Sequence, residues 1–193
     1  MIGPDTPIRL VFVGPPGSGK GTQAKLLNEK FGVTCIGTGD LLRSAVREGT
    51  PSGKLAEPYM KRGELVPDEV VNARVNEYFS GPSPPKKFLL DGYPRNTSQA
   101  EFLDKSLKAA GISLTRVILF DVPDDELVRR LETRGTIEAR PDDSIEVIRN
   151  RLKLYHETTE PVVGHYRRSG LLAEIRATGT KDDIHKQVVA ILG

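Results

Sequence analysis

The sequence has little of what would direct a protein to an oxidising compartment or into a membrane. Its one cysteine, Cys35, cannot form an internal disulfide, and we expect it to be a small core residue at a strand end. The longest apolar runs, such as 10–13 and 117–120, are too short to cross a bilayer. The N-terminus also lacks the features of a signal peptide. We therefore expect a cytoplasmic protein without a membrane span.

An excess of one charge is also missing. The 28 basic and 26 acidic residues leave a formal net charge of +2. Binding to nucleic acid or to a membrane surface without sequence recognition needs a strong positive field, so we expect neither partner. Any anion site must be local. The length of 193 residues fits one compact domain, 1–193, and a monomer is the default expectation.

Short β-branched runs alternate with longer stretches of helical spacing. The expected strands are 8–13, 33–36, 88–90, 116–120 and 171–175. The expected helices are 22–30, 40–48, 68–79, 98–110, 124–134, 144–157 and 182–192, and several of them open with Ser, Thr, Asp or Pro. This alternation predicts an α/β fold, with a five-stranded parallel sheet covered by helices on both faces. Helical residues 51–79 and a polar loop, 135–143, interrupt the alternation and are expected to leave the core.

The strongest functional signal is the run Gly-Pro-Pro-Gly-Ser-Gly-Lys at 14–20. It follows a predicted strand and opens a predicted helix, where glycine amides cradle phosphates and a lysine neutralises their charge. A glycine turn is the alternative, but the placement of Lys20 favours a phosphate loop. The general pattern has Ser or Thr directly after the lysine, whereas Gly21 intervenes here. We therefore do not expect Thr22 to ligate a metal directly.

Two further segments follow the second and third predicted strands. The first is Gly-Thr-Gly-Asp-Leu-Leu-Arg at 37–43, and the second is Asp-Gly-Tyr-Pro-Arg at 91–95, with Gln99 four residues beyond Arg95. Alone, the first is a capped helix with a surface arginine, and the second is a strand end with a solvated arginine. Because ligands bind at the carboxyl edge of parallel strands, both segments together with the phosphate loop predict one site.

The segments 14–22, 38–43 and 91–95 resemble those of the nucleoside monophosphate kinase family in order and approximate spacing. The resemblance covers essentially the whole chain and is greatest to the short-lid adenylate kinases. It implies a P-loop NTPase-like core (1–37, 80–134 and 144–193), an AMP-binding flap at about 38–79 and a short lid at about 135–143. The implied reaction is the reversible, magnesium-dependent transfer of the γ-phosphoryl group of ATP to AMP, giving two ADP, with lid closure excluding water.

The resemblance also implies which residues hold each nucleotide. ATP would be bound by Pro16, Gly17, Ser18, Gly19, Lys20, Gly21, Thr22, Arg130, Arg134 and Lys181. AMP would be bound by Thr38, Gly39, Arg43, Leu65, Val66, Gly92, Arg95, Gln99, Arg140 and Arg151. The implied catalytic residues are Lys20, Asp91, Arg95, Arg134, Arg140 and Arg151. Asp91 would organise hydrated magnesium, with no direct protein ligand to the ion.

The predicted lid region is rich in arginine and poor in acidic partners. We expect Arg129 and Arg149 to be solvated, whereas the resemblance assigns Arg130, Arg134, Arg140 and Arg151 to the phosphates. Residues 135–139 contain neither cysteine nor histidine, which excludes a structural zinc there.

Three alternatives to this function are open. Asn96 directly after Arg95 resembles the UMP/CMP kinases. The family resemblance associates a hydroxyl at the position of Thr38 and a glutamine at that of Gln99 with adenine, and a glutamine can offer a donor and an acceptor to its edge. A P-loop switch or ATPase would need a water-positioning residue and would not need Thr38, Arg43, Arg95 and Gln99. The presence of both Lys20 and Asp91 argues against a non-catalytic nucleotide-binding domain.

Overall fold

The computed structural model describes residues 6–80, 83–138 and 144–193, with the side chains of 134–138 outside that description. It contains one parallel sheet whose strands are ordered β2-β3-β1-β4-β5. The strands are β1 (Arg9–Val13), β2 (Thr34–Gly37), β3 (Phe88–Asp91), β4 (Arg116–Asp121) and β5 (Leu172–Arg176). The prediction of a five-stranded parallel sheet is confirmed, and each strand begins within one residue of its expected start.

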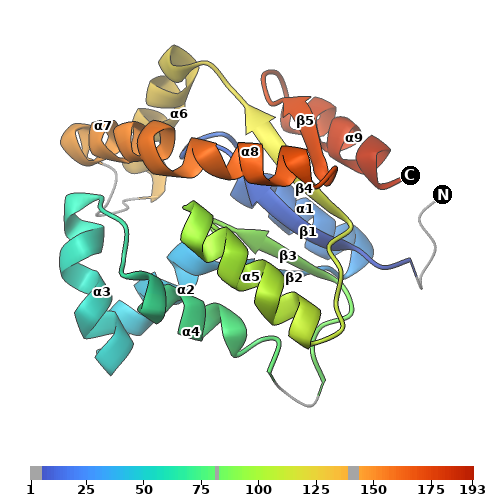
Figure 1. The fold of residues 1–193 in the computed structure, drawn as a ribbon. Helices are drawn as coiled ribbons and strands as arrows, with labels where there is room; N and C mark the ends of the chain where they lie inside the picture. Colours follow the sequence, from blue (N-terminus) through green and yellow to red (C-terminus); the bar gives the residue numbers. More distant parts are fainter. Residues whose placement is uncertain (1–5, 81–82, 139–143) are drawn as a thin grey trace.

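Helices connect the strands and cover the sheet (Figure 1). They are α1 (Lys20–Phe31), α2 (Thr38–Arg47), α3 (Pro51–Arg62), α4 (Asp68–Asn76), α5 (Thr97–Ala109), α6 (Asp124–Glu138), α7 (Ile145–Leu154), α8 (Glu160–Arg168) and α9 (Lys181–Leu192). A single π-helical turn, Tyr155–Thr159, joins α7 to α8 without a break in the helical path. Helices α3 and α4 lie at the edge of the molecule in Figure 1, and their buried residues Ala56, Val71 and Val75 belong to one of its apolar clusters.

Alternating residues of β1 show why helices cover both faces of the sheet. Val11 and Val13 belong to an apolar cluster that includes residues of α4, α5 and α8. Leu10 and Phe12 belong to a second cluster, with residues of α1, α6 and α9. All four side chains are at most 2% exposed. Because successive strand residues point to opposite faces, a continuous apolar run indicates a strand buried on both sides.

The strand order places two loops together at the carboxyl edge of the sheet. The chain leaves β1 toward β2 on one side, and it leaves β3, the neighbour of β1, toward β4 on the other. Such a reversal is the point where ligands bind in open α/β sheets. The segments that follow β1 and β3 are 14–20 and 91–95, so the fold brings the predicted phosphate loop beside the second predicted site.

Three local predictions differ from the structure. Helix α6 continues to Glu138, four residues into the segment expected to be a loop, so Gly135 does not end it. No helix was predicted between 157 and 182, but α8 forms there, with Pro161 in its first turn, where proline is tolerated. Cys35 is exposed in β2, not a core residue, and its thiol donates to the carbonyl oxygen of Ala24 at 3.1 Å.

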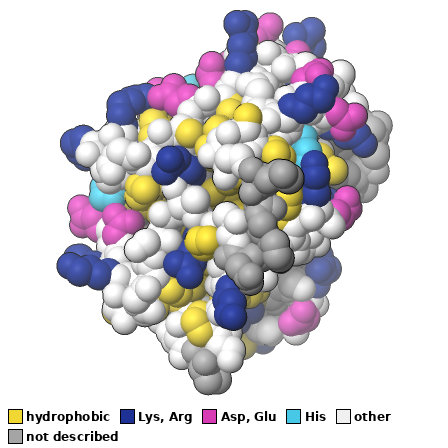
Figure 2. All heavy atoms as spheres, turned by 90° about the vertical axis from the view of Figure 1, so that its right-hand side faces the viewer, with side chains coloured by type: hydrophobic (Ala, Val, Ile, Leu, Met, Phe, Trp, Pro, Cys, Tyr) yellow, Lys and Arg dark blue, Asp and Glu magenta, His cyan; other side chains and the backbone are white. Residues whose placement is uncertain are grey.

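The face seen in Figure 2 shows acidic and basic side chains scattered together around apolar ones. This distribution agrees with the formal charge of +2. Among the described residues, we find no helix with the length and apolar character needed to cross a membrane.

Candidate functional site

An open cleft with a volume of about 1090 Å³ lies at the carboxyl edge of the sheet. A smaller pocket lies beside it, between α2, the start of α5 and the segment 60–66. Both cavities are lined by Gly39, Arg43, Gly63, Leu65, Gly92, Arg95 and Arg151. We call the larger cavity the donor cleft and the smaller one the acceptor pocket. Because they share this lining, they form one continuous space.

The phosphate loop forms one wall of the donor cleft. The ammonium of Lys20 donates to the carbonyl oxygens of Gly14 at 2.7 Å and Pro15 at 2.8 Å, and to Ser18 Oγ at 3.2 Å. A Cβ added to Gly17, whose φ is +84°, would lie 2.8 Å from Leu131 Cγ in α6. Glycine is therefore required there by both the backbone conformation and the packing.

Helix α1 begins at Lys20 directly after the loop. Its N-cap residue is Gly19, which has no side chain with which to cap the first amides of the helix. By contrast, α5 is capped by Asn96, whose Oδ1 accepts from the amide of Gln99 at 2.8 Å. The first-turn amides of α1 thus face the donor cleft without a side-chain cap, an arrangement suited to an anion.

Every described residue predicted to bind ATP lines the donor cleft. These are Pro16, Gly17, Ser18, Gly19, Lys20, Gly21, Thr22, Arg130 and Lys181, and Asp91 lines it as well. Arg130 donates to Glu126 at 2.9 Å and to the carbonyl oxygen of Ala177 at 3.1 Å, which joins α6 to the loop after β5. The backbone oxygen of Lys181 accepts from the buried side chain of Gln23 at 2.8 Å.

Every described residue predicted to bind AMP lines the acceptor pocket. These are Thr38, Gly39, Arg43, Leu65, Val66, Gly92, Arg95, Gln99 and Arg151. The elements involved are α2, the loop between α3 and α4, the segment after β3, α5 and α7. The pocket is also lined by residues that were not predicted: Leu42, Met60, Gly63, Glu64 and Val71. The roles of the predicted residues toward a ligand stay predictions.

A compact set of contacts holds the segment after β3 in place. Thr38 is 3% exposed and donates to the carbonyl oxygen of Gly92 at 2.8 Å. Arg95 Nε donates to the same oxygen at 2.8 Å. A Cβ added to Gly92, whose φ is +74°, would lie 3.0 Å from the Arg95 guanidinium and 3.1 Å from Thr38 Oγ1. The guanidinium and the hydroxyl therefore converge on Gly92.

Gln99 is held at both ends of its side-chain amide. Its Oε1 accepts from the backbone amide of Arg95 at 2.7 Å, and its Nε2 donates to Asp68 Oδ1 at 2.8 Å. Asn96 Nδ2 donates to the same Asp68 oxygen at 3.0 Å. Gln99 is only 2% exposed, so its amide is fixed within the pocket wall.

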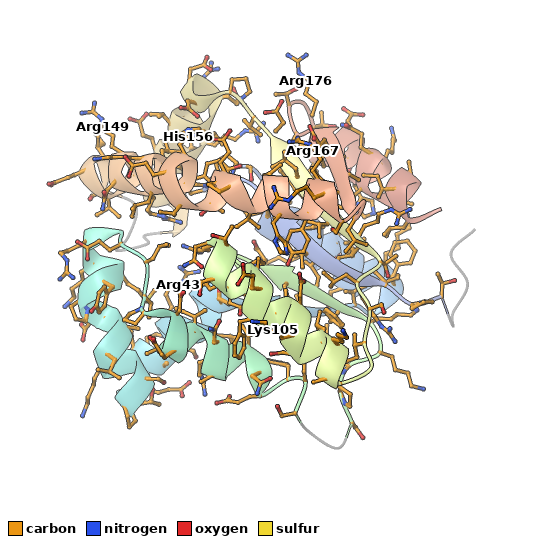
Figure 3. The ribbon with its side chains drawn as sticks, viewed as in Figure 1. Arg43, Lys105, Arg149, His156, Arg167 and Arg176 are labelled. Atoms are coloured by element: carbon orange, nitrogen blue, oxygen red, sulfur yellow. The ribbon has the colours of Figure 1, made fainter. Side chains whose placement is uncertain are left out.

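The predicted arginines differ in where their side chains lie. Arg43, Arg95 and Arg151 lie where the two cavities join, and Arg43 also pairs with Asp40 at 2.7 Å. Arg149 is exposed and points outward from α7, whereas Arg43, on α2, lies below α7 in this view (Figure 3). Arg129 is exposed and pairs with Glu126 at 2.8 Å. The exposure of Arg129 and Arg149 agrees with their prediction as solvated residues.

The other two predicted arginines are Arg134, at the end of the predicted core segment, and Arg140, in the predicted lid. Arg134 lies on α6, but its side chain is not among those that the structure describes. Arg140 lies outside the described residues, as does most of the predicted lid.

Three residues that the sequence did not single out support the site. Asp68 holds the Gln99 amide, and Thr159 Oγ1 donates to the carbonyl oxygen of Arg95 at 2.8 Å. Asn150 Nδ2 donates to the carbonyl oxygen of Arg62 at 2.7 Å and so links α7 to the end of α3. Of these three, only Asp68 is recognisable in the sequence, as an acidic residue at a predicted helix start, and this pattern predicts a helix terminus, not a ligand pocket.

A phosphate loop at the reversal of a parallel sheet, with an arginine-lined pocket beside it, defines a P-loop nucleotide-binding protein with a second anion site. The comparisons narrow this class. The adenylate kinase family model matches residues 12–171. The chain belongs to the adenylate kinase family, and it is a phosphotransferase of the nucleoside monophosphate kinase class.

Curated relatives are similar over nearly the full chain. The adenylate kinase of Thermus thermophilus is 42% identical, covering 95% of this chain and 96% of the relative. The adenylate kinase of Thermobifida fusca is 44% identical, covering 96% and 98%. That of Thermodesulfovibrio yellowstonii is 44% identical over 212 aligned positions, more than the 193 residues of this chain. This last relative therefore contains residues without a counterpart here.

Proposed function

We propose that this protein transfers the γ-phosphoryl group of ATP to AMP, reversibly, giving two ADP. The observation that carries the proposal is the position of Arg43, Arg95 and Arg151, which line both the donor cleft and the acceptor pocket. Three guanidiniums at the junction of two cavities suit a reaction in which two polyanions must meet. A protein that only bound or hydrolysed one nucleotide would have no need for a second pocket with this lining.

Phosphoryl transfer to AMP depends more on positioning and charge neutralisation than on proton transfer. The phosphate oxygen of AMP is already anionic, so its attack on the γ-phosphorus needs no general base. The barrier comes from bringing two repelling anions into line and from the charge that develops on the transferred group. Preorganised guanidinium and amide donors lower both costs.

In the donor cleft, the loop amides and Lys20 would hold the β- and γ-phosphates. The Lys20 ammonium lies within the loop and donates to its carbonyl oxygens, so it would lie beside a phosphate bound there. Arg130 would contact the phosphates from α6, and Arg134 is proposed to do so one turn further along. The backbone of the loop before Lys181 would face the adenine of ATP.

The residues present fit the magnesium ion that the family implies. A Cβ added to Gly21 would lie 3.6 Å from Asp91 Oδ2, so this carboxylate lies against the start of α1, next to the phosphate loop. Magnesium is bound through one or two carboxylates together with waters and substrate phosphates, so a single carboxylate is sufficient. We propose that Asp91 holds the hydrated ion, which would neutralise phosphate charge. Among the described residues, no cluster of three or more potential ligands suggests another metal.

In the acceptor pocket, Arg43, Arg95 and Arg151 would bind the phosphate of AMP, joined by Arg140 from the lid. Thr38, Gly39, Leu65, Val66, Gly92 and Gln99 would surround the adenosine. We propose that residues 38–79 act as a flap and 135–143 as a lid, which close on the substrates and exclude water from the γ-phosphate. We also propose a cytoplasmic monomer without nucleic-acid or membrane partners.

An acceptor panel tests this function. Purified protein is given magnesium and ATP with AMP, CMP or UMP, and the nucleotide products are separated over time. Diphosphate formed chiefly from AMP, together with conversion of ADP alone into ATP and AMP, is the expected result. Preference for CMP or UMP would overturn the base assignment, and release of inorganic phosphate alone would overturn the transferase function.

A further inference from the structure

Behind the wall of the acceptor pocket lies a half-buried acidic contact that the proposed reaction does not require. Asp68 is the first residue of α4, and its Oδ1 accepts two hydrogen bonds from the start of α5: one from Gln99 Nε2 and one from Asn96 Nδ2. Thirty-one residues separate Asp68 from Gln99 in the sequence, so the contact is tertiary. Asp68 itself does not line either cavity.

The chemistry of its partners fixes which way the Gln99 amide points. An ionised carboxylate can only accept hydrogen bonds, so it must face the NH₂ group of Gln99. The backbone amide of Arg95 can only donate, so it must face Oε1. A flipped amide would put oxygen against the carboxylate and NH₂ against the Arg95 amide, and would lose both bonds in a buried position.

Gln99 lines the acceptor pocket and keeps part of its hydrogen-bonding capacity. Among the interactions of the described residues, one Nε2 hydrogen and one Oε1 lone pair are used, which leaves one donor and one acceptor in a fixed arrangement. A 6-aminopurine presents a donor at its amino group and an acceptor at N1. A 6-oxopurine presents the reverse, an acceptor at O6 and a donor at N1.

We infer that Asp68 is a specificity-determining positioning residue, which orients the Gln99 amide so that the acceptor pocket takes 6-aminopurine and rejects 6-oxopurine monophosphates. The inference rests on the proposed function. The 6-oxopurine would require the flipped amide, and Asp68 makes that flip costly. Specificity of this kind comes from an unfavourable contact with the wrong ligand as much as from a favourable one with the right ligand.

The test compares AMP with inosine monophosphate, which differ in the six-position group and in the protonation of N1. Values of kcat/KM with magnesium and ATP are measured for the wild type and for Asp68→Ala. We expect the ratio for AMP over inosine monophosphate to fall about tenfold or more in the variant, with the KM for ATP unchanged. An equal loss for both acceptors would show a merely structural role and overturn the inference.

Two further variants test whether the specificity depends on the hydrogen-bond-accepting oxygen of Asp68 or on its negative charge. Asp68→Asn keeps an acceptor in the same place, and because Asn96 and Gln99 both donate to it, the ratio should stay within about threefold of wild type. A ratio as low as that of Asp68→Ala would overturn the assignment to the oxygen. Glu69→Ala removes an exposed charge from the same helical turn and should leave the ratio unchanged.

Asp68→Ser provides the same test if the alanine variant does not fold. Serine is well tolerated at a helix start but is too short to reach Gln99, so the ratio should again fall. An unchanged ratio in a folded serine variant would overturn the inference. Failure of the wild type to use AMP would instead refute the proposed function, so the two failures are distinguishable.

Discussion

The donor cleft and the acceptor pocket adjoin each other but are built in different ways. The residues that would hold the donor phosphates come mainly from one continuous segment, 14–22, where the loop and the first turn of α1 supply both backbone and side chain. The acceptor pocket draws on α2, the loop before α4, the segment after β3, α5 and α7. The phosphate loop is local in the sequence, whereas the acceptor pocket is assembled by the fold.

The hydrogen bonds show the same difference. Those of Lys20 in the loop span at most six residues. Those that position Gln99 and Arg95 reach 31 residues to Asp68 and 64 residues to Thr159. Substitutions on the donor side should therefore act at the substituted group itself. On the acceptor side, substitutions of residues that touch no nucleotide should also change the kinetics with AMP.

The largest effect is expected at the donor loop. Lys20→Ala removes the cation beside the phosphates, and we expect kcat to fall about a thousandfold or more with every acceptor alike. Circular dichroism and thermal unfolding should show the fold retained. Lys30→Ala, an exposed cation in the last turn of the same helix, is the control and should leave kcat unchanged. Near-normal turnover of Lys20→Ala would refute the phosphate-loop assignment.

The acceptor side should respond selectively. Arg95→Ala removes a guanidinium from the junction of the two cavities, and we expect kcat/KM for AMP to fall about a hundredfold while the KM for ATP changes less than about threefold. Steady-state kinetics with each nucleotide varied in turn provide the measurement. Arg149→Ala, exposed on α7, is the matched control. Equal losses for the two nucleotides would break the distinction between the sites.

A residue of the π-helical turn tests action at a distance. Thr159→Val keeps the shape but removes the hydroxyl that donates to the Arg95 carbonyl oxygen. We expect the KM for AMP to rise about fivefold to tenfold, and the free energy of unfolding to fall by about 1 to 2 kcal/mol. Thr159→Ser keeps the hydroxyl and should restore the KM. If the KM for ATP rose as much as that for AMP, the effect would not be specific to the acceptor pocket.

The same contrast explains what the sequence could predict. The strands and the phosphate loop are local patterns: an apolar run bounded by turn residues, or glycines and a lysine at fixed spacing. The acceptor residues Thr38, Arg43, Arg95 and Gln99 were predicted because a family resemblance links their segments. Asp68 and Thr159 carry no such signal, because their importance arises only when the fold brings them to Gln99 and Arg95.

The misread elements have equally local causes. Pro161 and Gly135 are helix-breaking residues by intrinsic preference, yet one lies in the first turn of a helix and the other within α6. Tertiary packing overrides such preferences where a helix has an apolar face to bury. In α8, Val162, Val163 and Tyr166 are at most 6% exposed. Periodicity alone did not show that this face continues past the proline.

The smallest expected effect is a pH dependence of stability at the π-helical turn, which should leave the acceptor pocket unaffected. His156 lies on that turn, with Nδ1 3.1 Å from Glu160 and Nε2 3.2 Å from Asp124 of α6. The hydrogen bond with Glu160 raises the pKa of His156, and Asp124 adds to the rise, against a lowering by burial. A raised pKa in the folded state stabilises the fold below the unfolded-state value of about 6.5, and this stabilisation is lost as pH rises through the folded-state pKa.

His156→Gln should therefore lower the free energy of unfolding more at pH 5.5 than at pH 8.5. Because 46% of the His156 side chain is exposed, the difference should be only about 0.5 kcal/mol or less. Urea unfolding at the two pH values measures it. His185→Gln should show the opposite sign, since burial lowers the pKa of His185 and its stabilisation is lost as the pH falls. The KM for AMP should not change in His156→Gln, because the Thr159 hydroxyl, and not the charge on the turn, holds Arg95. If the wild-type KM for AMP instead changed with pH as His156 titrates, and this change were absent from His156→Gln, the charge on the turn would also affect the acceptor pocket.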